Sequence, residues 1–334
     1  MRVLFDCRVP YMFWHGGMQV QIEQTKAALQ EIGVDVEYFR WWDETQTGEI
    51  LHFFGRTPTA LLHAAQGKGM KVVQAEMLPG LGSRPLWKRR LHRVAIRVLG
   101  LAMPQSVLGH FNWDSYRLAD ACVALTPWEA QLMVEVFGAP RERVHVVPNG
   151  VEECFLQSPP RVRGSWLVCT ATIRELKRVL ELARSAVRAE VPLWVIGKPY
   201  NDSDPYARQF AKFAQDHSAF VRFEGPVSDR VRLAEIYREA RGFVLLSAVE
   251  SLSISALEAA ACECPLLLGD LPWARTAFGD SASYCPLGSV RVTARRLRQF
   301  YDQAHTVPRP PRPAGWLQIA RQLTAVYESI CASH

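Results

Sequence analysis

The hydrophobic positions of this chain form short apolar runs that alternate with longer segments of helical periodicity. In the first 150 residues, the runs typical of buried strands are followed by segments whose apolar positions recur every three or four residues. The expected strands cover residues 3–7, 34–39, 50–55, 71–76, 121–126 and 144–150, and the expected helices cover 19–32, 59–66 and 128–137. Strands interleaved with helices predict parallel βαβ units and a doubly wound sheet.

The same alternation restarts after a polar, Pro-rich segment at 154–165, which we interpret as a linker. Here the expected strands cover 166–173, 192–197, 221–225, 242–247 and 264–270, and the expected helices cover 177–189, 205–217, 230–240 and 253–261. A second Pro-rich stretch precedes a last helix with one apolar face, formed by Ile319, Leu323, Val326 and Ile330. We therefore expect an α/β protein with two Rossmann-like doubly wound domains, at 1–150 and 163–305, and a C-terminal helix at 315–332. Two such domains would face each other across a cleft lined by the carboxyl ends of their strands.

Composition narrows the class of protein. Of 334 residues, 49% are hydrophobic and 22% charged, as in packed globular proteins. No apolar run approaches the ~20 residues of a membrane span. The N-terminus lacks the features of a secretory signal, so we expect a cytoplasmic protein. The eight cysteines mostly lie in apolar elements and are expected to be reduced, and the Cys262/Cys264 pair lacks the partners of a zinc site. The net charge of +6 permits an anionic ligand, but no nucleic-acid signature is present.

Two turns between a strand and a helix carry residues suited to an anion. Gly16 and Gly17 follow the first strand, where backbone amides and a helix N-terminus can approach a phosphate. A tight turn without a ligand is the alternative. Lys177 lies near the start of a helix, where the helix dipole disfavours a cation unless an anion binds beside it. A lysine exposed to solvent is the alternative there.

The segment around residues 242–270 carries the strongest signal. Glu250 closes a strand, and Glu258 follows eight residues later on a helix. Between them lie serines that can cap the helix and free amides that can bind a phosphate, in the run Ser251, Leu252, Ser253 and Ile254. One carboxylate can accept hydrogen bonds from sugar hydroxyls and the other from ribose hydroxyls. The spacing of the two glutamates alone is common by chance.

Taken together, the Gly-Gly turn, the lysine and the E-x7-E element resemble glycosyltransferase family 4, whose retaining enzymes have the GT-B fold. The segments at 148–151 and from Leu271 onwards, and the last helix with Trp316 and Tyr327, extend the similarity over nearly the whole chain. The resemblance implies a cleft that binds a nucleotide sugar, UDP- or GDP-linked, and no catalytic metal or other cofactor.

By this resemblance, Lys177 would neutralise the leaving diphosphate and Glu250 would orient the transferred sugar. Glu258 would hold the ribose. The donor site would also include Gly16, Gly17, Thr172, Arg174, Gly197, Lys198 and residues 251–254. Many relatives carry an arginine where this chain has Thr172, and Arg174 is a candidate to replace its contact with the phosphates.

The acceptor side departs further from the family. Many relatives have a histidine after a strand like that at 71–76, and the matching position here is Glu76. Glu76 either serves the acceptor hydroxyl or caps the following loop. His15 is the other candidate on the acceptor side.

A basic stretch without acidic residues predicts a further surface. Residues 84–103 form an amphipathic helix with Trp87, Leu91, Val94, Ala95, Val98 and Ala102 on one face and Lys88, Arg89, Arg90, Arg93 and Arg97 on the others. Such helices can lie on anionic lipid. An ordinary packed helix with a solvated basic side is the alternative. The first interpretation predicts peripheral contact with the inner face of the plasma membrane.

The sequence therefore predicts a retaining hexosyltransferase that acts on a glycan or lipid-linked acceptor in cell-surface polysaccharide or glycoconjugate synthesis. Two alternatives stay open. One is a nucleotide-sugar epimerase of the same fold, for which no convincing acid/base set is present. The other is a non-catalytic subunit that binds a nucleotide sugar. The presence of Lys177, Glu250 and Glu258 argues against it, and the changes at Thr172 and Glu76 keep it open.

Overall fold

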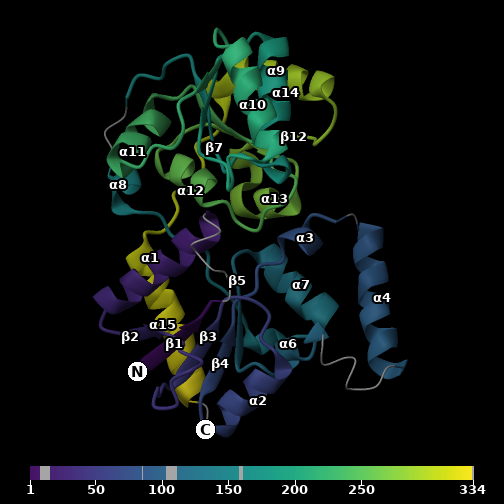
Figure 1. The fold of residues 1–334 in the computed structure, drawn as a ribbon, viewed down its shortest axis with the longest axis vertical. Helices are drawn as coiled ribbons and strands as arrows, with labels where there is room; N and C mark the ends of the chain where they lie inside the picture. The colour runs from purple at the N-terminus through teal and green to yellow at the C-terminus, as the bar shows by residue number, and fades with distance from the viewer. Residues whose placement is uncertain (8–15, 85, 103–110, 158–160, 333–334) are drawn as a thin grey trace. The chain divides into compact units, whose positions relative to one another are not determined.

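Two six-stranded parallel sheets, each flanked by helices, account for the fold (Figure 1). The structure is a computed structural model that describes residues 1–7, 16–84, 86–102, 111–157 and 161–332. The chain divides into two units. The first contains the described residues up to Asn149 and the C-terminal helix α15, and the second contains Gly16, Gly17 and Gly150–Gly315. The predicted α/β class, with two doubly wound sheets, is confirmed.

The first unit has the strand order β2-β1-β3-β4-β5-β6. Its strands are β1 (Arg2–Asp6), β2 (Asp35–Tyr38), β3 (Ile50–Phe53), β4 (Lys71–Gln74), β5 (Ala121–Ala124) and β6 (Val144–Val146). Its helices are α1 (Gly17–Glu31), α2 (Thr59–Gly67), α3 (Pro79–Gly82), α4 (Leu86–Ala102), α6 (Ser115–Leu118), α7 (Pro127–Phe137) and α15 (Trp316–Ala332). Every residue of β3 and of β5 is buried, as expected for strands of a parallel sheet covered on both faces.

The second unit has the strand order β12-β11-β10-β7-β8-β9. Its strands are β7 (Leu167–Thr170), β8 (Leu193–Ile196), β9 (Val221–Phe223), β10 (Gly242–Leu245), β11 (Leu266–Gly269) and β12 (Ser283–Cys285). Its helices are α8 (Glu153–Leu156), α9 (Val179–Ala189), α10 (Pro205–Asp216), α11 (Arg230–Glu239), α12 (Ile254–Ala261), α13 (Pro272–Phe278) and α14 (Val290–Gln303). In sequence order this is the 3-2-1-4-5-6 arrangement of a dinucleotide-binding sheet.

Local sequence explains where the helices begin and end. Thr126 caps α7 by accepting a hydrogen bond from the Glu129 amide at 3.2 Å, and Pro127 takes the first helical position, where no amide is needed. Gly138 then closes the helix in the left-handed conformation. Asp229 caps α11 in the same way through two amides.

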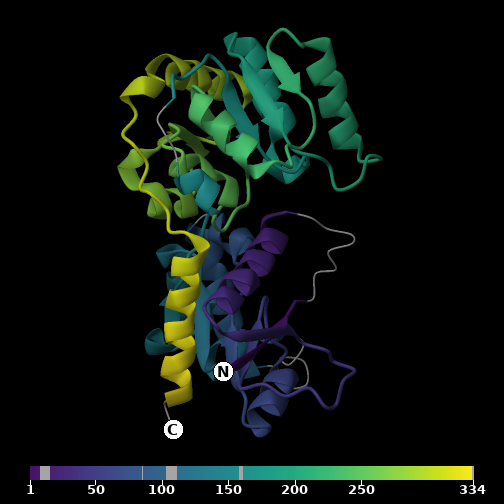
Figure 2. The ribbon, with the colours of Figure 1, turned by 90° about the vertical axis from the view of Figure 1, so that its left-hand side faces the viewer.

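The last helix, α15, lies against the first unit, where it is yellow in Figure 2. The predicted apolar face is confirmed, since Ile319, Leu323, Val326 and Ile330 are all buried. The Tyr327 hydroxyl lies 2.5 Å from Nδ1 of His52 in β3. This buried pair ties the end of the chain to the centre of the first sheet.

Four helices or strands of the second unit are not among those predicted: α8, α13, β12 and α14. The helix α8 covers the start of the segment interpreted as a linker, and this segment belongs to the second unit. The buried stripe of α14 is narrow, with Ala294, Leu297 and Phe300 set among arginines. All eight cysteines are free. Within the described residues, no helix combines the length and the apolarity that crossing a bilayer requires.

Candidate functional site

The strand order of the second sheet fixes where a ligand is best placed. The order reverses between β7 and β10, because the chain moves outward from β7 in one direction and later from β10 in the other. In sheets with this strand order, ligands bind outside the carboxyl ends of the strands, next to the reversal. The loop after β7 carries Thr172, Arg174 and Lys177, and the loop after β10 carries Glu250.

The structure brings Lys177 and Glu250 together. The Lys177 ammonium donates a hydrogen bond to Oε1 of Glu250, and both side chains are largely buried. A backbone bond from the Ala248 amide to the Leu176 carbonyl, at 2.8 Å, holds the two loops in register. A fixed cation beside a fixed carboxylate can bind an anion on one side and a hydroxyl donor on the other.

The four residues after Glu250 are buried at the start of α12. Ser253 caps the helix, and its Oγ accepts from the Ala256 amide at 3.3 Å. The Oγ of Ser251 is buried and has no hydrogen-bond partner among the described residues. A buried hydroxyl without a partner costs free energy, and a bound ligand would satisfy it.

The remaining predicted donor residues form a second group around Tyr200. Nη1 of Arg174 donates to the Tyr200 hydroxyl at 3.3 Å, and the guanidinium lies 5.2 Å from the ring centre. The Ile173 amide donates to the Lys198 carbonyl at 3.1 Å, which joins the loops after β7 and β8, while the Lys198 side chain is exposed. Arg174 is therefore held at this edge of the sheet.

Two glycines in this region are required by geometry. Gly197 has φ +152°, and a Cβ there would lie 1.9 Å from the Ala171 carbonyl oxygen. Gly16 has φ +140°, and a Cβ there would lie 3.6 Å from the Tyr200 hydroxyl and 3.8 Å from Oγ1 of Thr172. Larger residues would strain the backbone at both positions. His15 lies outside the described residues.

Glu258 occupies a separate buried cluster. Nη2 of Arg230 donates to its Oε1, and the Tyr237 hydroxyl donates to its Oε2 at 3.3 Å. Burial raises the pKa of Glu258 to about 7, although the Arg230 charge opposes the shift. Arg230 is not among the residues predicted from the sequence. It is the first residue of α11, so the dipole argument applied to Lys177 would have identified it as well.

In the first unit, Glu76 follows β4 and binds two side chains. Its carboxylate accepts from Nε of Arg56 at 2.9 Å, from Nη2 of Arg56 at 3.2 Å and from the Tyr116 hydroxyl. It accepts no backbone amide among the described residues, so the structure gives no support to a role as a loop cap. Arg56 and Tyr116 were not predicted. The position of Arg56 directly after a buried strand was the available signal.

No three His, Cys, Asp or Glu side chains in the described parts of the chain are grouped so that they could hold a metal ion.

Family models and curated relatives that match this chain are glycosyltransferases. Residues 166–303 match the model described as "Glycosyl transferases group 1", and residues 49–153 match "Glycosyltransferase Family 4". The chain is 30% identical over 210 residues to a D-inositol 3-phosphate glycosyltransferase of Frankia alni, covering 57% of this chain and 50% of the relative. It is 27% identical over 286 residues to the protein of that name from Jonesia denitrificans, covering 78% and 61%. These alignments thus span about half to three fifths of the relatives' lengths.

Solved structures show the fold. The Anabaena protein HepE, in complex with UDP and glucose, superimposes with a TM-score of 0.68 at 12% identity, covering 98% of this chain and 99% of that one. A sucrose-phosphate synthase from Thermosynechococcus elongatus gives 0.71 at 14% identity, covering 100% and 99%. The fold is therefore GT-B, as predicted.

Proposed function

Since this chain belongs to the group 1 glycosyltransferases of family 4, we propose that it transfers a hexose from a UDP- or GDP-sugar with retention at the anomeric carbon. The observation that carries the proposal is the Lys177–Glu250 ion pair at the point where the strand order reverses. A cation for the diphosphate and a carboxylate for the sugar hydroxyls are thereby placed side by side.

The reaction needs negative charge to be stabilised on the departing diphosphate. Lys177 and the start of α12, with the Ser251 hydroxyl, would do this without a metal. Glu250 would accept from the hydroxyls of the transferred sugar. Because Lys177 and Glu250 neutralise each other in the ion pair, a phosphate would draw the ammonium away and free the carboxylate for the sugar.

Glu258 would hold the ribose. Each carboxylate oxygen can accept more than one hydrogen bond, so the contacts with Arg230 and Tyr237 leave acceptor capacity. With a pKa of about 7, the Glu258 carboxyl would be only partly charged near neutral pH, and Arg230 favours the charged form. Tyr200 and Arg174 would then flank the phosphates or the nucleoside.

For the acceptor, we propose a hydroxyl of a glycan or of a lipid-linked sugar, in cell-surface polysaccharide or glycoconjugate synthesis. Glu76, with Arg56 beside it, is the candidate contact in the first unit. The relatives named D-inositol 3-phosphate glycosyltransferases make a phosphorylated polyol the second acceptor to test.

The helix α4 supports a role at a membrane surface. It packs along α7, with the Arg89 guanidinium 4.2 Å from the Trp128 ring centre and Ile96 against the core of the first unit (Figure 1). Its predicted apolar face points away from that core. Trp87, Leu91, Val94 and Val98 are each 55–59% exposed.

This arrangement is the reverse of an ordinary packed helix, which buries its apolar face and exposes its charges. Lys88 and Arg90 are exposed beside the apolar side chains. An apolar ridge flanked by cations suits the interface of an anionic bilayer. We therefore propose that α4 brings the protein to the inner face of the plasma membrane, where a lipid-linked acceptor would lie.

A thermal-shift panel followed by a transfer assay tests the function. The true donor among UDP-, GDP- and ADP-sugars should raise the melting temperature with concentration. NMR of the product should then show the donor's anomeric configuration. Epimerised donor without acceptor would indicate the epimerase instead, and binding without transfer to any acceptor would indicate a non-catalytic subunit.

A further inference from the structure

A pocket in the second unit lies at the sheet edge opposite the predicted donor residues. Arg241 directly precedes β10, and Pro265 directly precedes β11, so both mark the amino ends of strands. Lys177 and Glu250 follow carboxyl ends of the same sheet. The pocket has a volume of about 860 Å³, which lies within the range of small-molecule sites.

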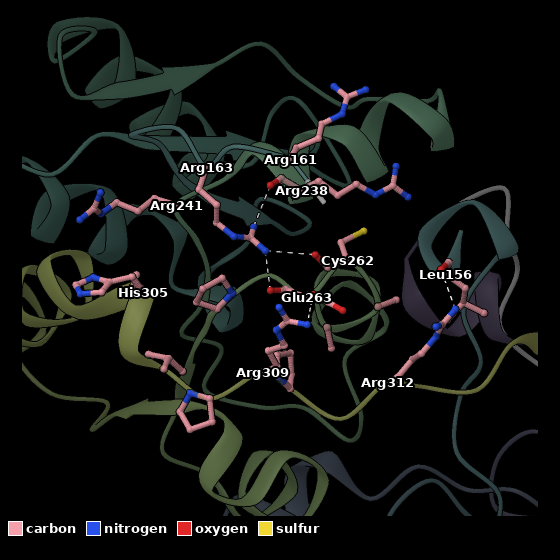
Figure 3. Close-up of a pocket in the computed structure, with 17 residues that line it drawn as sticks. Leu156, Arg161, Arg163, Arg238, Arg241, Cys262, Glu263, His305, Arg309 and Arg312 are labelled. Carbon is pink, nitrogen blue, oxygen red and sulfur yellow. Dashed lines mark hydrogen bonds and ion pairs between the residues drawn. The ribbon is translucent and has the colours of Figure 1, made fainter. Parts of the chain in front are cut away.

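Arginines dominate its lining (Figure 3). The ionisable side chains are Arg161, Arg163, Arg238, Arg241, Arg309, Arg312, His305 and Glu263. Two of the arginines have carboxylate partners: Arg161 pairs with Glu235 and Glu239, and Arg309 pairs with Glu263. The other four have none among the described residues, so the pocket carries excess positive charge.

Two of these four are held rigidly by backbone carbonyls. Arg163 donates to the carbonyls of Tyr237, Arg238, Ala240, Cys262 and Glu263 at 2.7–3.4 Å, which fixes its guanidinium at the ends of α11 and α12. Arg238 is buried and donates to the carbonyls of Cys154 and Gln157, while its Nε has no partner in the described chain. Their charges are fixed in place without a counter-ion.

The other two keep donors free. Arg241 uses only Nε, toward the Tyr301 carbonyl, and its guanidinium lies 4.3 Å from the Tyr301 ring centre. Arg312 uses only Nη2, toward the Leu156 carbonyl at 2.8 Å. The remaining guanidinium nitrogens of both have no partner among the described residues. Planar guanidinium groups with free donors match the oxygens of phosphate in pairs.

We propose that this pocket binds a phosphorylated small molecule that carries at least two phosphate charges. A single carboxylate would leave most of the excess charge uncompensated, whereas a diphosphate or a phosphate ester brings more negative charge. Pro308 and Pro310 stiffen the segment that closes one side, so this wall needs little ordering on binding. The site is distinct from the donor site and does not depend on the proposed transferase activity.

Inorganic pyrophosphate is the probe, and the full chain with Lys177→Ala is the starting protein, because this change removes the cation expected to bind a diphosphate in the donor site. Calorimetry should detect one pyrophosphate per chain. Arg312→Gln should weaken this binding about tenfold, the effect of losing one charge-assisted contact to phosphate. Because Arg312 is exposed, the variant should fold normally, and Arg241→Gln provides a second test.

The matched control is Arg298→Gln, which removes the same charge from exposed α14 outside the pocket. It should leave pyrophosphate affinity unchanged. The proposal is overturned if the Lys177→Ala protein binds no pyrophosphate, or if Arg298→Gln weakens binding as much as Arg312→Gln. Neither result would bear on donor binding, which the nucleotide-sugar panel measures on the unmodified protein.

Discussion

Lys177 and Glu250 stand 73 residues apart and form an ion pair where the loops after β7 and β10 meet. If this pair forms the donor site, Lys177→Ala should lower kcat by about 10²–10³, the usual effect of losing one preorganised donor to a developing anion. Steady-state transfer assays with the identified donor measure this. Lys212→Ala removes an exposed lysine of α10 in the same unit and should leave kcat unchanged. Equal rates for Lys177→Ala and the unmodified protein would exclude the proposed role.

Gly197→Ala should destabilise the second unit, because the new methyl group would meet the Ala171 carbonyl. Gly225→Ala is the matched control, since Gly225 also has a positive φ, of +85°, but nothing lies within 4 Å of the place where its methyl group would stand. We expect Gly197→Ala to cost at least about 2 kcal/mol more than the control in urea unfolding. If both variants lose a similar amount of unfolding free energy, the loop around Gly197 relaxes to accommodate the methyl group.

His52 makes the stability of the first unit depend on pH. Burial lowers its pKa to about 3, whereas an exposed histidine has about 6.5. Between these values the unfolded chain binds a proton that the folded chain does not, so stability should fall as pH decreases below about 6.5. The slope approaches about 1.4 kcal/mol per pH unit.

Urea unfolding at several pH values between 7 and 4 checks this dependence. His52→Gln should reduce the slope, even though it removes the contact with Tyr327. His63→Gln, at an exposed position on α2, should leave the slope as it is. If the pH dependence of the unfolding free energy is unchanged in His52→Gln, it arises from other titratable groups.

The exposed face of α4 should bind anionic vesicles. Trp87→Ser with Leu91→Ser should reduce co-sedimentation with vesicles rich in phosphatidylglycerol, and added salt should weaken binding of the unmodified protein. Val231→Ser alters a similarly exposed apolar residue, on α11 in the second unit, and should have no effect. Equal co-sedimentation with anionic and neutral vesicles would contradict the membrane proposal.

Much of the fold follows from local pattern. Buried parallel strands are continuous apolar runs, and capping residues such as Thr126 and Asp229 mark where the helices between them begin. The grouping of Lys177 with Glu250 was also predictable, because the carboxyl ends of neighbouring strands in a doubly wound sheet meet at one edge. α14 was not predicted because arginines surround its narrow buried stripe.

The side chains that pair with the predicted glutamates could not be identified from the sequence. Glu258 and Glu76 were identified from sequence, but their arginines, Arg230 and Arg56, lie on other elements and become neighbours only after folding. The orientation of α4 is a similar case. Periodicity shows that Trp87 and Leu91 share a face, but only tertiary packing decides whether that face is covered.

Arg163 lies in the Pro-rich segment before β7 and has a structural role within the second unit. Its one guanidinium fastens the last turns of both α11 and α12, and those helices carry Arg230 and Glu258 on facing surfaces. Loss of the Arg163 guanidinium should therefore shift the ends of α11 and α12 relative to each other. If Glu258 holds the ribose as proposed, substitution of Arg163 should lower the affinity for the nucleotide through this shift, although Arg163 itself does not contact the nucleotide.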